Sequence, residues 1–237
     1  MQIYNHLNNP LADQPTHRRI KLRVSNGSTV NYCYILIDEV SKEAIAIDPA
    51  WDIDLIHKTI SQYGAKLRAI FVTHHHKDHF DLANTLSMIY LAPVWMSLQE
   101  VEYYKISLDN LNTFDKDMRL MIGSFSVQAI VTPGHTFGSA CYLIDECLYT
   151  GDTLFIEGCG LCRGKGSSAQ ELFRSLQKIK NIIPLNTKIY PGHRYARELG
   201  ASFSYLLRHN IYLCIDDEEV FVRFRMRENQ RNLFDFI

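Results

Sequence analysis

The sequence FVTHHHKDH at residues 71–79 places four metal-binding side chains directly after a short apolar run. The run from Leu67 to Val72 is typical of a buried strand, and functional loops commonly follow the strands of α/β folds. Neither the alternation of a strand nor one face of a helix requires this spacing of polar residues. Neutral imidazole and carboxylate are ligands that zinc and non-haem iron favour. The candidate ligands are His74, His76, Asp78 and His79.

Three more candidate ligands occur downstream, each in a turn at the end of an expected strand. They are His135 in TPGHT (132–136), Asp152 in TGDT (150–153) and His193 in PGH (191–193). The neighbouring glycines allow the backbone to turn sharply toward a metal. Seven ligands are too many for one tetrahedral ion and fit two ions that share a bridging carboxylate. His75 alternates with His74 and His76, and we therefore expect it to point away from them.

The periodicity of the remaining chain predicts strands first in hairpins and then between helices, and this order repeats in the second half. Such an order predicts two sheets packed face to face with helices outside. Strands are expected at 30–38, 44–47, 67–72, 94–96, 118–122, 124–131, 140–144, 147–149, 188–190 and 211–214. Helices are expected at 52–63, 81–90, 97–106, 168–180, 202–209 and 217–227. No repeat or linker divides the chain, which predicts one domain at 1–237, with its core at about 20–200 and a short extension at 201–237.

The composition is that of a globular protein with a sizeable core, since 46% of the 237 residues are hydrophobic. A formal net charge of −1 gives no general electrostatic case for binding nucleic acid or an anionic membrane. No apolar stretch approaches the roughly 18 to 20 residues that span a bilayer. The polar N-terminus does not resemble a secretory signal, and six scattered cysteines favour reduced thiols. We therefore expect a cytoplasmic protein.

The histidine cluster, the two Pro-Gly-His sequences and GDTLF at 151–155 together resemble the metallo-β-lactamase superfamily, in its glyoxalase II-like branch. The resemblance extends from about Val30 to Tyr195. It implies an α/β fold, the four-layer αβ/βα sandwich, with the metals in a groove at one end of the two sheets. It also implies a role for each ligand: His74, His76 and His135 on the first metal, Asp78, His79 and His193 on the second, and Asp152 as the bridge.

The same resemblance matches Asp48 of the sequence AIDP (46–49) to an aspartate that orients a ligating histidine. A simple helix-entry turn is the alternative for Asp48. His6, His17, His57 and His209 stand alone in the sequence, and we expect them to be surface or core residues.

Two divalent ions about 3.5–4 Å apart lower the pKa of a shared water, so that it can attack a carbonyl without a serine or cysteine nucleophile. We expect two zinc ions, with iron or manganese as alternatives. Asp78 and Asp152 are the expected catalytic residues, because a ligating carboxylate can also handle the proton. A thiolate leaving group suits a second metal, which favours a thioester as the substrate.

Several sequences around the site bear on the substrate. Tyr195 matches a substrate-contacting tyrosine of glyoxalase II, but GCGLCR at 158–163 lacks the lysine of the glyoxalase pattern and the arginine that persulfide dioxygenases carry at Leu161. The run 155–162 and RFRM at 223–226 instead resemble zinc-dependent hydrolases of polyketide biosynthesis, which are thought to release acyl groups from carrier-protein thioesters. Under that resemblance, Arg163 and Lys165 contact the phosphate of a phosphopantetheine arm. A solvated loop is the alternative.

Other functions remain open at this point. The runners-up are glyoxalase II and a mononuclear iron persulfide dioxygenase that uses His74, His135 and Asp152. A module that keeps metals only structurally, and a lactone hydrolase, are further alternatives. The expected partner is a small-molecule or acyl-carrier-protein thioester, with no nucleic acid and no membrane, and the oligomeric state is open.

Two groups of apolar and sulfur side chains are left without a role. Cys159 and Cys162 form a single C-x-x-C, and we expect these thiols to pack against the site. Phe221, Phe224 and Phe234 form either a partner-binding or dimer surface or part of the core.

Overall fold

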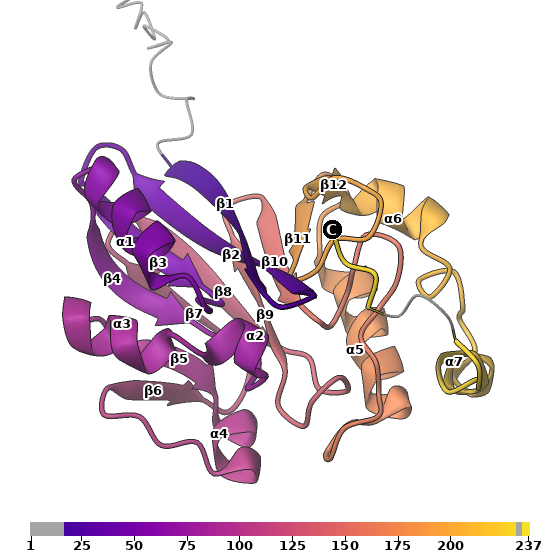
Figure 1. Ribbon diagram of the computed structural model, residues 1–237. Helices are drawn as coiled ribbons and strands as arrows, with labels where there is room; N and C mark the ends of the chain where they lie inside the picture. The colour runs from indigo at the N-terminus through magenta and orange to yellow at the C-terminus, as the bar shows by residue number, and fades with distance from the viewer. Residues whose placement is uncertain (1–16, 231–233) are drawn as a thin grey trace, which may run out of the picture.

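The computed structural model describes residues 17–230 and 234–237, so the expectation for His6 lies outside the described residues. Within them the chain forms two six-stranded sheets (Figure 1). The first contains, in spatial order, β1 (His17–Asn26), β2 (Thr29–Asp38), β3 (Glu43–Ile47), β4 (Lys66–Phe71), β5 (Val94–Ser97) and β6 (Leu111–Phe114). The second contains β12 (Ala201–Ser202), β11 (Lys188–Pro191), β10 (Cys147–Gly151), β9 (Ala140–Ile144), β8 (Phe125–Val131) and β7 (Met118–Ile122).

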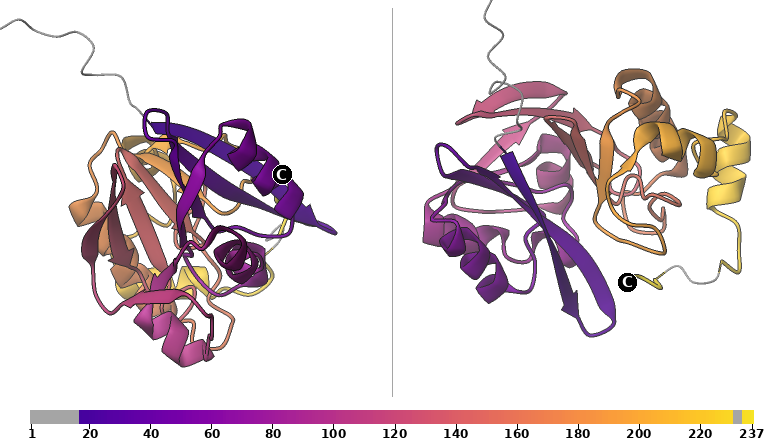
Figure 2. Two further views of the ribbon diagram at one scale, coloured as in Figure 1. Left: turned by 90° about the vertical axis from the view of Figure 1, so that its left-hand side faces the viewer. Right: turned by 90° about the horizontal axis from the view of Figure 1, so that it is seen from above.

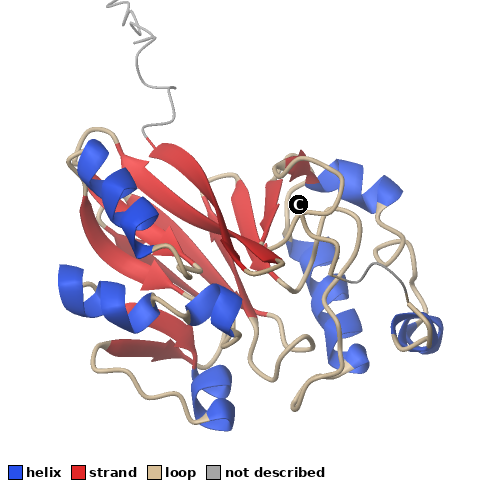
Figure 3. Cartoon of the chain, viewed as in Figure 1, coloured by secondary structure: helices blue, strands red, loops and turns tan. Residues whose placement is uncertain are grey.

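Helices cover the outer face of each sheet, as the colouring by secondary structure makes visible (Figure 3). On the first sheet, α1 (Ile53–Gln62) and α3 (Ala83–Tyr90) contribute to a buried outer cluster. On the second, the corresponding cluster contains side chains of α5 (Ala169–Ile182), α6 (Phe203–His209) and α7 (Glu218–Arg225). Two short helices, α2 (Lys77–Phe80) and α4 (Leu98–Tyr104), complete the described elements. The predicted four-layer αβ/βα sandwich is confirmed, and Figure 2 shows it from two further sides.

The core between the two sheets explains the apolar sequence of β2. Tyr32, Tyr34 and Leu36 point into this middle layer, where they meet side chains such as Tyr149 of the second sheet. The alternate residues of β2, such as Ile35, pack under the helices of the outer layer. Because both faces of the strand are covered, its sequence from Tyr32 to Ile37 is a continuous apolar run instead of an alternating one.

The helix starts follow the capping residues of the sequence. Ser168 accepts a hydrogen bond from the Glu171 N–H at 3.2 Å at the start of α5, and Asp52 accepts one from the Leu55 N–H at 2.9 Å at the start of α1. These contacts satisfy backbone donors that have no partner inside a helix.

Several boundaries differ from the prediction. Strands β1, β6 and β12 and the short helix α2 were not predicted. The strand predicted at 211–214 is wrong, because these residues form turns. Asn210 Oδ1 accepts a hydrogen bond from the Tyr212 N–H at 3.0 Å, and the Asn210 carbonyl accepts one from the Leu213 N–H at 3.0 Å. Local bonds therefore use the backbone groups that a sheet would need. In the described residues, no helix has the length and apolar character to cross a membrane.

Candidate metal centre

The ends of strands from both sheets deliver the candidate ligands to one place. The histidine cluster follows β4 of the first sheet, whereas His135, Asp152 and His193 follow β8, β10 and β11 of the second. All seven fall into three overlapping groups, in each of which the ligand atoms lie within 4.8 Å of one another. The structure thus brings together all seven candidates, although they are separated by up to 119 residues in the sequence.

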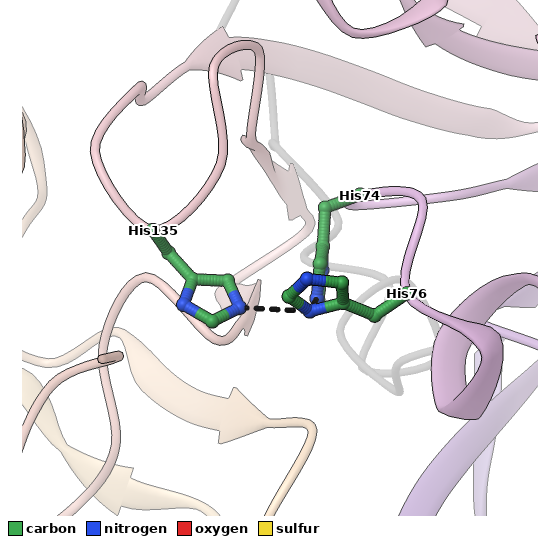
Figure 4. Close-up of side chains that lie close together, drawn as sticks. All are labelled: His74, His76 and His135. Carbon is green, nitrogen blue, oxygen red and sulfur yellow. Dashed lines mark hydrogen bonds between the residues drawn. The ribbon is translucent and has the colours of Figure 1, made fainter. Parts of the chain in front are cut away.

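His74, His76 and His135 form the first group (Figure 4). Nδ1 of His76 lies 3.0 Å from Nε2 of His74 and 3.1 Å from Nε2 of His135. Burial lowers the pKa of His74, and burial followed by the neighbouring charge of His135 lowers the pKa of His76 to about 4. The imidazoles are therefore neutral at pH 7, which is the state that binds a metal.

Asp78, His79 and His193 form the second group. Oδ2 of Asp78 lies 3.2 Å from Nε2 of His193 and 3.7 Å from Nε2 of His79. Burial alone would raise the pKa of Asp78, but the charge of His79 and the hydrogen bond with His193 lower it to about 2. Asp78 is therefore a carboxylate at neutral pH.

Asp152 lies between the two groups and faces both with its two oxygens. Oδ2 is 3.5 Å from Nε2 of His135, and Oδ1 is 3.3 Å from Nε2 of His79 and 3.5 Å from Nε2 of His193. Burial opposes its ionisation, yet the charges of His193 and His79 hold the pKa of Asp152 well below its usual range. This placement is what a carboxylate shared by two cations requires.

Hydrogen bonds at the far side of four imidazoles fix which nitrogen is free. The partner of Nδ1 is the Val30 carbonyl for His193 (2.6 Å) and the Leu161 carbonyl for His135 (2.8 Å). These oxygens only accept, so Nδ1 carries the proton and Nε2 presents its lone pair. Further partners are the Asp48 carboxylate for His79 (2.9 Å) and the Thr73 hydroxyl for His74 (3.0 Å).

Asp48 forms hydrogen bonds with Thr73, next to the ligand His74, and with the ligand His79. Its carboxylate accepts hydrogen bonds from the Thr73 N–H and the Thr73 hydroxyl, both at 2.7 Å, and from His79. Its backbone has a φ of 51°, a conformation rare outside glycine and typical of functional sites. Asp52, not Asp48, caps the following helix. The structure therefore places Asp48 as the residue that orients His79, the role implied by the sequence resemblance.

Two buried polar atoms of the centre support its fit to cations. Among the described residues, Nε2 of His79 and Oδ1 of Asp152 have no hydrogen-bond partner, although both are shielded from solvent. Buried polar atoms are normally paired, and an orphaned nitrogen beside an orphaned carboxylate oxygen is a donor set that a divalent ion completes. The residues present thus fit two zinc-like ions.

Glu100 is a functional residue that sequence reasoning missed. Its buried carboxylate accepts hydrogen bonds from the His75 N–H (2.9 Å) and from Nδ1 of His75 (2.7 Å). It also accepts from the Thr136 hydroxyl (2.9 Å) and the Gly138 N–H (2.8 Å). His75 points away from the centre, as expected. Nothing in the sequence distinguishes Glu100 from the other polar residues of α4.

Strand β2 also holds the centre, which sequence reasoning missed. The Asn31 amide donates a hydrogen bond to the Asp78 carbonyl, and the Tyr32 N–H donates one to the Gly192 carbonyl at 2.8 Å. The Tyr34 hydroxyl donates to the carbonyl of Pro191. Strand β2 is therefore hydrogen-bonded to α2, which follows β4 of the first sheet, and to the end of β11 in the second sheet.

A cavity of about 420 Å³ opens onto the centre, within the range typical of ligand sites. Tyr195 and Arg163, both predicted to contact substrate, line it. Burial, followed by the charge of Asp152, raises the pKa of Tyr195, so its phenol is neutral. Lys165 is not among the lining residues, and its ammonium lies over the ring of Tyr103 at 5.7 Å.

The remaining candidates separate into core and cavity residues. Cys159 and Cys162 are buried in the cluster under α5 to α7, and none of the six cysteines is in a disulfide. Phe221 belongs to the same cluster, and Phe224 packs against it. Phe234 is instead 68% exposed and lines the cavity.

Comparison with known proteins agrees with this geometry. Residues 29–193 match the family model described as the metallo-beta-lactamase superfamily. The chain is 45% identical over 206 residues to the "Probable polyketide biosynthesis zinc-dependent hydrolase PksB" of Bacillus subtilis, covering 87% of this chain and 92% of that protein. It is 36% identical over 193 residues to a hydroxyacylglutathione hydrolase of Bartonella tribocorum, and the match covers 80% of this chain and 73% of that protein. The crystal structure of ETHE1 from Myxococcus xanthus superimposes on this structure with a TM-score of 0.79 at 27% sequence identity. The match covers 91% of this chain and 95% of that chain.

Proposed function

The chain belongs to the metallo-β-lactamase superfamily, and from this membership we propose that it is a dinuclear zinc-dependent hydrolase of acyl thioesters on a carrier protein. The observation that carries the proposal is the position of Asp152, whose Oδ2 faces His135 of the first group and whose Oδ1 faces His79 and His193 of the second. A single ion would leave one of these groups without a cation.

Zinc ions bound there supply Lewis-acid activation of a water and of the thioester carbonyl. The residues of the chain bind the metals, accept a proton and contact the substrate. The neutral imidazoles of His74, His76 and His135 donate lone pairs without first losing a proton, and the ionised carboxylates of Asp78 and Asp152 can accept the proton that the water gives up. The neutral phenol of Tyr195 can donate a hydrogen bond to the substrate at the edge of the cavity.

The carrier-bound form of the substrate is supported by Arg163 and by the relatives. Arg163 is exposed on the rim of the cavity, where its guanidinium can bind the phosphate of a phosphopantetheine arm bidentately. Lys165 lies over Tyr103 and contributes only if the loop moves. The relative that is 45% identical carries polyketide biosynthesis and zinc dependence in its name.

A panel of thioesters on coenzyme A, glutathione and acyl carrier protein tests the proposal, with metal content measured on the same sample. We expect hydrolysis of the carrier-bound thioester and about two zinc ions per chain. Asp152→Asn should lose both activity and metal, whereas the exposed Asp109→Asn, as the matched control, should keep both. Full activity with fewer than about 1.5 zinc per chain would contradict the dinuclear assignment.

Glutathione thioester hydrolysis is the second candidate, favoured by the 36% identity to a hydroxyacylglutathione hydrolase. Activity confined to the glutathione thioesters of the panel would select it and leave the metal assignment intact. A mononuclear iron dioxygenase held by His74, His135 and Asp152 would instead contain about one iron per chain and consume oxygen with glutathione persulfide.

A further inference from the structure

The last described residues of the chain, 234–237, lie against the metal centre. The ring of Phe236 stacks on the imidazole of His193, with centroids 3.9 Å apart and planes at 10°. It also meets the ring of Tyr195 edge-on at 5.1 Å. Figure 1 places the C mark close to β11 and β2, far from the end of α7. This segment therefore belongs to the site, although it follows the last helix of the fold.

Hydrogen bonds attach the segment 234–237 to the loop after β11 and to strand β2. The Ile237 N–H donates to the Arg194 carbonyl at 2.9 Å, and the Tyr32 hydroxyl donates to the Ile237 carbonyl at 3.0 Å. A tight turn, in which the Phe236 N–H donates to the Phe234 carbonyl at 2.8 Å, brings the two phenyl rings to 6.2 Å. The two rings therefore line the cavity from a fixed backbone.

Aromatic rings beside His193 and a guanidinium beyond His135 line different parts of the cavity. Phe155 meets both His193 (6.0 Å) and Tyr195 (5.7 Å) edge-on, next to Phe236. On the side of His135, the lining residues are Leu161, Arg163 and Gly164. A ligand that spans the metal centre would therefore have an apolar end and an anionic end.

We propose that Phe155, Phe234 and Phe236 form a binding site for the apolar acyl chain of the substrate, and that residues 234–237 determine which acyl chains the enzyme accepts. This inference rests on the proposed thioester hydrolysis. The acyl chain lies on the His193 side, and the phosphate-bearing arm leaves past Arg163. An acyl chain of several carbons covers the Phe234 side chain, which is otherwise a large apolar group in solvent.

The test compares acetyl and octanoyl thioesters of N-acetylcysteamine with the zinc-loaded full-length enzyme. We expect the octanoyl-to-acetyl ratio of kcat/KM to fall about tenfold or more in Phe234→Ala and Phe236→Ala, since lost contacts in an apolar pocket discriminate by such factors. Phe137→Ala is the matched control, because this exposed phenylalanine is not among the lining residues of the cavity and should keep the ratio of the parent enzyme. Zinc content is measured for every variant.

A second measurement separates this inference from the proposed function. Octanoate binding is followed by the fluorescence of Trp51, which lines the cavity. If the enzyme cleaves the thioesters but both variants keep the ratio, the acyl site is wrong and the hydrolase assignment stands. If no thioester is cleaved, the hydrolase assignment is wrong. Weaker octanoate binding by Phe234→Ala would then still support the apolar site, and unchanged binding would overturn it.

Discussion

The carboxylate of Glu100 lies 2.7 Å from Nδ1 of His75, the histidine that points away from the metal ligands on either side of it. The same carboxylate reaches the backbone N–H of Gly138, three residues after the ligand His135. One buried anion in α4 therefore joins the two loops that carry the first group of ligands.

Glu100→Gln keeps the shape of this side chain but replaces one accepting oxygen with a donor. We expect the free energy of unfolding to fall by about 1–3 kcal/mol, because at least one buried N–H loses its partner. We also expect zinc affinity to fall about tenfold or more, since outer partners orient the ligands. Urea denaturation and competition with a chelator measure both effects. The exposed Glu102→Gln is the control, and equal behaviour of the two variants would contradict the role of Glu100.

Gly192 lies so close to His79 that no side chain fits between them. A Cβ at this position would be 2.2 Å from Cε1 of His79. We therefore expect Gly192→Ala to displace this imidazole and to reduce the metal content from about two ions to about one per chain. Gly158→Ala is the matched control, because its Cβ would meet Tyr212 at an ordinary 3.8 Å. Elemental analysis after dialysis decides, and two tightly held ions in Gly192→Ala would refute the argument.

Asp48 fixes the tautomer of His79 through a 2.9 Å hydrogen bond. Asp48→Asn replaces a charged acceptor with a neutral amide, which should weaken binding of the second zinc about 10- to 100-fold. Calorimetric titration of the metal-free protein measures the two binding steps separately. The control variant Asp109→Asn should bind both zinc ions with the affinities of the parent protein. A loss confined to the first binding step would show that Asp48 does not act through His79.

Asp38 predicts a pH dependence of stability outside the metal centre. Hydrogen bonds from the hydroxyl of Ser124 (2.6 Å), the Val40 N–H (2.9 Å) and the hydroxyl of Ser41 (2.9 Å) lower its pKa to about 2. The pKa of Asp38 in the folded protein is therefore below its value of about 3.9 in the unfolded chain. The ionised carboxylate stabilises the fold above about pH 4, and this stabilisation is lost as the pH falls toward about 2.

Asp38→Asn should therefore lower the free energy of unfolding by about 1–3 kcal/mol at pH 7, and the difference should shrink toward about pH 3. Urea denaturation of metal-free parent and variant at several pH values measures this. Metal-free protein is used so that zinc loss in acid does not enter the comparison. A difference that stays constant or grows on acidification would show that the charge of Asp38 is not the cause.

The metal ligands could be predicted from the sequence because they follow apolar strands closely, at positions where the packing of a strand or helix gives no reason for histidine or aspartate. Glu100 and Asn31 could not, because their roles come from burial against loops far away in the chain. At 211–214, a short apolar run was predicted to be a strand, but Asn210 closes a turn whose hydrogen bonds the sequence pattern does not reveal. Phe236 reaches His193 across a chain reversal that no local pattern encodes.

Strand β2 contacts α2 at Asp78 and the loop after β11 at Gly192, and each of the two ligand groups combines residues that follow strands of both sheets, so the docking of the sheets sets the distances within each group. Substitutions deep in the middle layer, such as at Tyr34 or Tyr149, are therefore expected to shift the ligands of one sheet relative to those of the other. Adaptation of this protein to heat or to a new substrate cannot tune the interior and the reaction centre independently.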